Sequence, residues 1–341
     1  MLETIWFILW GVLWAVYFML DGFDLGLGTL LPVLSKNETD RRIIYNSMGP
    51  FWDGNEVWLI TAGGATFAAF PVAYAVMFNG LYSALLLLLF ALIIRGVCFE
   101  FRNKIDSDGW RGLWDAAMVI GSFLPALLLG VAFANIFEGL PIDQDGVFQG
   151  GLFTLLNPYG LAGGVLFVLL FLVHGSLWLA LKSEGALQQR AGAMAKKLWP
   201  VLLVVAVLFL AFTLVATDLF NNYFKMPVLW ILPLIAVLAL LGTFVFIRQA
   251  AWLKAWLSSA VTILFVTFFG VAGLFPRLLP SSLNPAYSIT IQNGAASQLT
   301  LKIMLVVALI MVPIVIAYQL WVYLFLGNKV TEKDLAYEEA Y

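Results

Sequence analysis

The chain has 341 residues, of which 62% are hydrophobic and 11% are charged, and its formal net charge is -2. Soluble domains carry about 25% charged residues, so this composition and the repeated apolar runs predict a single polytopic membrane domain over residues 1–341. The nearly neutral charge, without a long basic tract, excludes nucleic acid as a partner.

Apolar runs bounded by charges, glycine and proline predict nine transmembrane helices. Their approximate ranges are 4–34, 53–71, 74–100, 112–138, 158–182, 197–217, 228–248, 253–275 and 300–327. The first run follows "MLETIW", which lacks the basic segment and cleavage site of a signal peptide, so we expect it to be retained. In the tail "TEKDLAYEEAY", Thr331 and Asp334 have capping-box spacing and predict a short helix.

Lysine and arginine are unevenly distributed between alternate loops, which predicts the orientation of the chain. The loops after the first, third, fifth and seventh predicted helices, with the tail, contain most of them: Lys36, Arg41, Arg42, Arg102, Lys104, Arg111, Lys182, Arg190, Lys196, Lys197, Arg248, Lys254, Lys329 and Lys333. The opposite loops contain only Lys225, Arg277 and Lys302. We therefore expect the N-terminus outside and the C-terminus in the cytoplasm, after an odd number of crossings.

Charged residues lie within the first three predicted helices, where a charge near the bilayer centre costs about 2.5–3.5 kcal/mol on insertion scales. They are Asp21, Asp24, Asp53, Glu56, Arg95 and Glu100. The predicted orientation gathers all of them toward the cytoplasmic side. Arg95 needs a counter-ion, which is either Glu100 or a carboxylate on a neighbouring helix. Buried carboxylates of this kind can form a proton entry path, and the ion site of a transporter would have the same composition.

Structural interpretations compete with this one. Gly22 and Gly26, beside Asp21, have the GxxxG spacing that allows another helix to approach closely. Asp53 and Glu56 fit a capping box at the start of the second helix. Either arrangement would make these acids part of the scaffold.

Few side chains can bind a redox cofactor. Cys98 is the single cysteine and His174 the single histidine, which excludes an intramolecular disulfide and leaves little room for several haems in this chain. Within "LFLVHGSLW", we expect His174 to be a hydrogen-bonded interior residue. We therefore expect no metal and no cofactor to be bound by this chain alone.

Four segments occur in an order found in a known family: "DGFDLGLG", "RRIIYNSMGPFWDGNEVWLITAGGATFAAFP", "RGVCFEFRNKI" and "ASQLTLKIM". On a chain of nine predicted helices they resemble subunit II of the cytochrome bd-type quinol oxidases, and "WDGNEVWL" is the most specific of them. The resemblance covers essentially the whole chain. It implies an all-α integral membrane fold of two four-helix bundles plus one peripheral helix.

The resemblance also implies partners, cofactors and an activity. This subunit would pair with a larger subunit I that binds low-spin and high-spin haem b and haem d, and it would itself carry no haem. The complex would oxidise quinol, reduce oxygen to water and generate proton motive force without pumping, in the bacterial plasma membrane. Small single-helix accessory subunits, membrane lipid and quinone could also associate with it.

Site residues follow from the resemblance by motif. The acids of the family's proton route correspond to Asp24 of "DGFD", Asp53 of "WDGN" and Glu100 of "CFEF", where relatives often have Asp. Trp58 matches a residue that lines an oxygen channel in some members. The supporting candidates are Asp21, Glu56 and Arg95.

Two alternatives stay open at this point. An ion-coupled secondary transporter would use the acids as a coupling site, and it predicts broken helices near the midplane and internal repeats, neither of which is evident. Alternatively, the chain is a subunit of the oxidase that serves only as a scaffold for the haem subunit. Such a scaffold should tolerate isosteric Asn and Gln at the acids.

Overall fold

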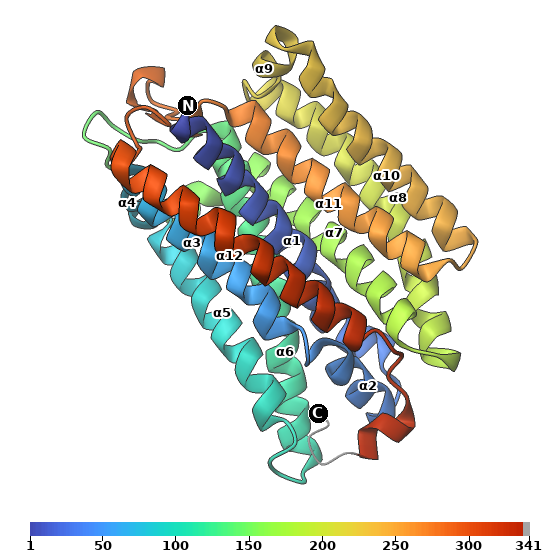
Figure 1. The fold of residues 1–341 in the computed structure, drawn as a ribbon. Coiled ribbons are helices and arrows are strands. Elements are labelled where there is room, and N and C mark those ends of the chain that lie inside the picture. The colour runs from blue at the N-terminus through green and yellow to red at the C-terminus, as the bar shows by residue number, and fades with distance from the viewer. Residues whose placement is uncertain (337–341) are drawn as a thin grey trace.

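Long helices lying side by side make up most of the protein in a computed structural model, which describes residues 1–336 (Figure 1). The α-helices are α1 (Leu2–Leu34), α2 (Glu38–Met48), α3 (Trp52–Ala69), α4 (Pro71–Gly80), α5 (Tyr82–Phe101), α6 (Asp108–Glu138), α7 (Pro158–Lys182), α8 (Gly185–Ala216), α9 (Phe220–Lys225), α10 (Ile231–Arg248), α11 (Trp252–Leu274) and α12 (Gln298–Phe325). The short elements are η1 (Leu152–Leu156), η2 (Pro227–Trp230), η3 (Pro285–Tyr287), η4 (Glu332–Ala336) and the antiparallel pair β1 (Arg277–Leu279) and β2 (Ile289–Thr290). In Figure 1, α1 starts at one end of the helix stack and α12 ends at the other.

Eight described helical segments are long and apolar enough to cross a membrane. They are Leu2–Leu34, Tyr82–Phe101, Asp108–Glu138, Pro158–Lys182, Gly185–Ala216, Pro227–Arg248, Trp252–Leu274 and Gln298–Phe325. The one predicted span missing from this set is the second, 53–71; it corresponds to α3, which has 18 residues and contains the polar side chains of "WDGNEVW". The count of nine crossings and the orientation therefore stay predictions.

The prediction of one continuous third helix over residues 74–100 is wrong. The structure divides it into α4, which ends at Gly80, and α5, which begins at Tyr82. Between them Leu81 has φ -96° and ψ 12°, outside the α-helical region. Asn79 and Gly80 are weak helix formers and precede this break directly, which a search for apolar runs does not detect.

Other helical segments lie outside the apolar runs. α2 falls in an expected loop, and the Asn37 side chain caps it by accepting the Asp40 N–H at 2.8 Å. α8 begins at Gly185, a dozen residues before the predicted start. The prediction missed these first turns because they are polar and do not belong to an apolar run. In the tail, where a short helix is predicted, Asp334 Oδ2 accepts the Thr331 N–H at 2.7 Å and the short 3-10 helix η4 follows. Residues 337–341 of that predicted tail helix lie outside the described residues.

α1 is the central helix and packs against α3, α6, α7 and α11. A Cβ atom on Gly22 would lie 2.6 Å from the Phe171 ring, and one on Gly26 would overlap the Phe171 carbonyl oxygen. From the opposite side, a Cβ atom on Gly175 of α7 would lie 2.7 Å from the Phe23 carbonyl oxygen. The close helix packing predicted from the GxxxG spacing is therefore confirmed, and α7 is the partner.

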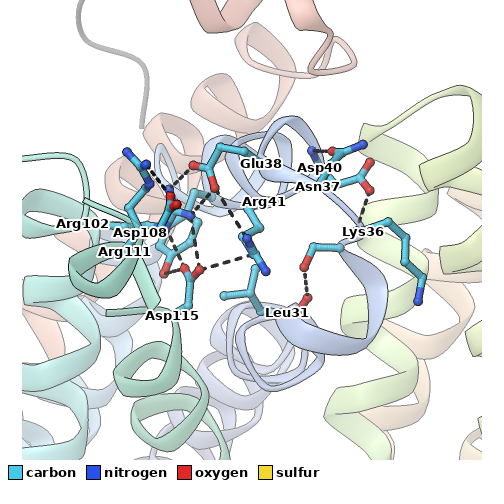
Figure 2. A network of polar contacts seen from close by, with 12 residues as sticks. Leu31, Lys36, Asn37, Glu38, Asp40, Arg41, Arg102, Asp108, Arg111 and Asp115 are labelled. Atoms are coloured by element: carbon cyan, nitrogen blue, oxygen red, sulfur yellow. Dashed lines mark hydrogen bonds and ion pairs between the residues drawn. The ribbon is translucent and has the colours of Figure 1, made fainter. Parts of the chain in front are cut away.

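Charged side chains tie α2 to α5 and α6 at the end of the stack where α12 finishes (Figure 2). The buried Arg102 donates to Glu38 Oε1 and to Asp115 Oδ1, each at 2.7 Å, and Arg41 lies 3.4 Å from Asp115 Oδ2. Burial alone would raise the pKa of Glu38, but the hydrogen bonds and charge of Arg102 outweigh burial and hold this pKa below its ordinary value. Glu38 is thus a charged partner that holds α2 against the helix ends.

We predict that Gly26→Ala destabilises the protein, because the added methyl group would push α1 away from the α7 backbone. Overpacking of this kind costs about 1–3 kcal/mol. Thermal unfolding of the purified protein in detergent measures the change. The matched control is Gly112→Ala in α6, where nothing lies within 4 Å of the new Cβ atom. Equal melting temperatures for the two variants would contradict the prediction.

Candidate functional site

A buried polar cluster lies where α1, α3, α5 and α12 meet in the half of the stack near α2. α1 contributes Asp21 and Asp24, one helical turn apart, and both are buried. α3 contributes Asn55 and Glu56, α5 contributes Arg95, and α12 contributes Gln319 and Tyr323. The cluster joins the start of the chain to its last membrane helix.

Arg95 is the cation of the cluster and is 1% exposed. Its Nη2 lies 2.6 Å from Asp21 Oδ1 and 3.4 Å from Glu56 Oε1, and its Nη1 donates to Asp21 Oδ2 at 3.3 Å. The counter-ions are therefore carboxylates on neighbouring helices, and Glu100 is not among them. One guanidinium connects three helices by ionic contacts.

The predicted capping box of Asp53 and Glu56 is wrong. α3 starts at Trp52 with Phe51 as its N-cap, and no side chain caps this end. Asp53 lies in the first turn, where its charge favours the positive end of the helix dipole. Glu56 is instead directed toward Arg95, because a buried guanidinium attracts a carboxylate more strongly than a free backbone N–H does.

Asp24 has a different environment from Asp21, because no cation among residues 1–336 forms an ion pair with it. Its Oδ2 accepts a hydrogen bond from Asn55 Nδ2 at 2.7 Å, while its Oδ1 has no hydrogen-bond partner in the described chain. The side-chain oxygen of Asn55, Oδ1, in turn accepts hydrogen bonds from the Tyr323 hydroxyl at 2.8 Å and from Gln319 Nε2 at 3.2 Å. Asp24 is held by a neutral amide and keeps one oxygen free.

Trp58 closes the cluster on the α12 side. Its Nε1 donates to Gln319 Oε1 at 2.6 Å, and the residue is 5% exposed. This bond fixes the amide of Gln319 so that its nitrogen faces Asn55. The oxygen-channel assignment of Trp58 stays a prediction.

Asp53 and Glu100 are exposed and do not contact Asp24. The Trp52 and Phe99 rings, each one residue earlier in the chain, stack with centroids 5.2 Å apart and hold this turn of α3 against that turn of α5. These two acids therefore lie outside the cluster's interior, which is formed by Asp21, Asp24, Glu56 and Arg95.

Sequence reasoning missed the neutral members of the cluster. Asn55 lies inside the motif "WDGNEVWL", and Gln319 is the amide in the apolar run "VIAYQLWVY". An amide in a membrane helix is a signal in itself, since it needs a hydrogen-bond partner there. Tyr323 gave less signal, because tyrosine is common near the ends of membrane helices.

His174 is a hydrogen-bonded interior residue, as predicted. Its Nδ1 lies 3.1 Å from Ser259 Oγ and its Nε2 lies 3.0 Å from the Met19 carbonyl oxygen. Both nitrogens of the single histidine are thus engaged, and it is not available as an axial ligand for haem iron. Within residues 1–336, no group of three or more His, Cys, Asp and Glu side chains is arranged to hold a metal ion.

A family model for cytochrome bd terminal oxidase subunit II matches residues 2–326. The chain belongs to this family. It is therefore a subunit of a membrane oxidoreductase and a multi-pass membrane protein, as its eight long apolar helices also indicate. The family assignment made from the four motifs is confirmed.

Relatives match nearly the full length of the chain. Cytochrome bd ubiquinol oxidase subunit 2 of Bacillus subtilis is 38% identical, and the match covers 98% of both chains. Cytochrome bd-I ubiquinol oxidase subunit 2 of Escherichia coli K12 is 36% identical, over 98% of this chain and 96% of that one. A chain of the bd oxidase structure from Geobacillus thermodenitrificans shares the fold, with a TM-score of 0.76 and 17% identity over 96% of this chain and 99% of that chain.

We predict that Arg95→Gln destabilises the assembled protein strongly, because Asp21 and Glu56 would be left without their cation. Removing one partner of a buried ion pair costs about 3–5 kcal/mol. Thermal unfolding and the yield of intact complex measure the effect. Arg95→Gln combined with Asp21→Asn should be more stable than Arg95→Gln alone, since one unpaired charge is removed. A single Arg95→Gln variant as stable as the wild type would contradict this.

Proposed function

We propose that this chain is the haem-free subunit of a bacterial plasma-membrane complex that oxidises quinol and reduces oxygen to water. The names of the relatives, ubiquinol oxidase subunit 2, support the quinol and a second, haem-bearing subunit. Haem b and haem d would be held by that partner, since the only histidine here is engaged at both nitrogens. Bound haem would supply the electron transfer and oxygen chemistry of the complex.

We propose further that Asp24, Asp53 and Glu100 form a route by which protons enter from the cytoplasm. Asp53 and Glu100 are exposed outside the cluster's interior and can exchange protons with water. Asp24 is buried and has one free carboxylate oxygen, so it can bind or release a proton without breaking an ion pair. This free oxygen on a buried acid is the observation that supports the route most strongly.

Glu56 and Asp21 support the route through Arg95. Glu56 lies three residues after Asp53, on the same side of α3, and 19% of its side chain is exposed. It therefore lies between the exposed acids and the buried Arg95–Asp21 pair. Arg95 offsets negative charge that three carboxylates would otherwise accumulate in the cluster.

An exposed apolar stripe on α3 supports a partner subunit on this side. Asp53 lies in line with the exposed residues Val57, Ile60 and Gly64 at helical spacing. The finer architecture, two four-helix bundles with α12 as the peripheral helix, is part of the same proposal, because α12 buries only Leu301.

A transporter and a pure scaffold are the competing functions. The family assignment disfavours a transporter, and Asp24 lies in the half of the stack near α2 rather than at a break in α1. The scaffold differs in one respect that can be tested. It has no use for an unpaired buried carboxylate, so it should tolerate an amide at that position.

We predict that the chain, purified from its native membrane in mild detergent, travels with a larger subunit that carries haem. The visible absorption spectrum should then show haem b and haem d bands, which this chain alone cannot supply. A gel identifies the accompanying subunits, including any small accessory ones. A colourless chain that recovers no haem partner under gentler extraction would contradict the oxidase assignment.

We predict that Asp24→Asn and Asp53→Asn slow oxygen consumption with quinol by about tenfold or more, because loss of a positioned proton donor typically costs 10²–10⁴-fold. Haem content, read from the absorption spectrum, should stay near that of the wild type. The control is Asp145→Asn in the loop between α6 and α7, far from the cluster. Full turnover in Asp24→Asn would remove Asp24 from the proton route and favour the scaffold.

A further inference from the structure

Lys182 is a buried cation at the end of α7 and is 3% exposed. Its Nζ donates to the carbonyl oxygens of Leu326 and Asn328, the latter at 2.6 Å. Its own carbonyl oxygen accepts the Val330 N–H at 2.7 Å. No carboxylate within residues 1–336 forms an ion pair with it. Lysine is rarely buried without a carboxylate partner, and here backbone carbonyl oxygens take the place of that partner. The role of Lys182 is therefore not to neutralise a buried acid.

The carbonyls that Lys182 binds are those at the C-terminal end of α12. Leu326 is the C-cap of α12, and Asn328 follows two residues later. The last carbonyls of a helix lack partners within it and carry partial negative charge. Lys182 therefore caps a helix to which it does not belong, and it fixes the end of α12 against the end of α7.

α12 depends on this contact because little else holds it. Leu301 is its only buried residue, and near that end the Trp6 Nε1 donates to the Leu301 carbonyl oxygen at 3.0 Å. Between Leu301 and the C-terminal end, most side chains of α12 are exposed. Its distal half is attached through the polar bonds of Gln319 and Tyr323, through Lys182, and through the packing of Val322 and Tyr323 against the core.

Tyr323 lies one turn before the Leu326 cap, so its position follows the position of that cap. Its ring centroid lies 4.7 Å from that of Phe51 and 5.8 Å from that of Trp178. The Lys182 Nζ lies 5.5 Å from the centroids of the same two rings, Phe51 and Trp178. The lysine, the two rings and the tyrosine therefore form one packed unit, from which the Tyr323 hydroxyl reaches Asn55.

We propose that Lys182 is a positioning residue for proton uptake: by capping α12 it fixes Tyr323 and Gln319, which hold Asn55 in its bond to Asp24. This inference rests on the proposed role of Asp24. The chain of contacts is continuous. It runs from Lys182 to the C-terminal end of α12, from Gln319 and Tyr323 of α12 to Asn55 Oδ1, and from Asn55 Nδ2 to Asp24 Oδ2. Loss of the cap would release the Tyr323 and Gln319 bonds and leave the Asn55 side chain held only by its donations to Asp24 and, at 3.3 Å, to the Leu20 carbonyl oxygen, so that its bond to Asp24 would be less well fixed.

The test compares Lys182→Met with Lys182→Arg in the purified haem-containing complex. Methionine matches the aliphatic part of the lysine side chain but cannot donate, whereas a guanidinium can still donate to two carbonyls. For Lys182→Met we expect kcat for oxygen reduction to fall by about tenfold, since misplacement by 1 Å can cost up to 10²-fold. KM for quinol should stay unchanged, and Lys182→Arg should recover most of the rate. The control is Lys254→Met, an exposed lysine at the start of α11.

Combination with Asp24→Asn separates positioning from simple stabilisation. If Lys182 acts through Asp24, the double variant should turn over no more slowly than Asp24→Asn alone. A multiplicative loss in the double variant, or full turnover in Lys182→Met, would overturn the inference while the role of Asp24 stands. Full turnover in Asp24→Asn would instead overturn the proposed proton route.

A second variant covers the case in which Lys182→Met does not assemble. Tyr323→Phe keeps the ring between Phe51 and Trp178 and removes only the hydroxyl that reaches Asn55. It should slow turnover and again add nothing to Asp24→Asn. Full turnover in Tyr323→Phe would overturn the inference, because the cap would then hold α12 without any effect on Asp24.

Discussion

The architecture depends on one guanidinium placed between two carboxylates inside the membrane. Arg95 of α5 contacts Asp21 of α1 and Glu56 of α3, which makes three helices mutually dependent. None of the three charges is tolerable alone in hydrocarbon, so the pairing fixes how these helices pack relative to each other. The close contact of α1 with α7 at Gly22 and Gly26 adds a fourth helix to these three. The cluster therefore has a rigid frame into which neutral groups can be fitted.

α12 completes this frame from the far end of the sequence. It brings an amide and a hydroxyl to Asn55 although it buries almost none of its own surface. Apolar packing cannot specify the rotation of such a helix, because lipid solvates every apolar face equally well. Polar contacts have to do so, and they are concentrated at Gln319, Tyr323 and the cap on Lys182. This makes α12 the element through which a distant residue can affect the interior acid.

The charged interior could be predicted because each charge in an apolar run has a cost that the sequence displays. The partner of Arg95 could not be predicted, since Glu100 and a carboxylate on a neighbouring helix fitted equally well. The structure resolves this by helix geometry: five residues place Glu100 roughly 140° around α5 from Arg95, on a different face. The bond between Tyr323 and Asn55 escaped prediction for another reason, because a tyrosine near a helix end is common and the two residues lie 268 positions apart. The break at Leu81 was missed because apolar content continues through it.

The two aspartates of "DGFD" differ in their surroundings, and this gives them different chemical properties. Asp21 accepts two hydrogen bonds from Arg95, so protonating it would break a buried ion pair and leave the cation unpaired. Asp24, one turn away, has a neutral amide for a partner and a free oxygen, so a proton can come and go with a small change in structure. Asp21 therefore belongs to the frame, whereas Asp24 is the acid of the proposed proton route. A scaffold needs only the first of these acids, and the presence of the second, held in place from α12, is the reason to propose proton transfer for this subunit.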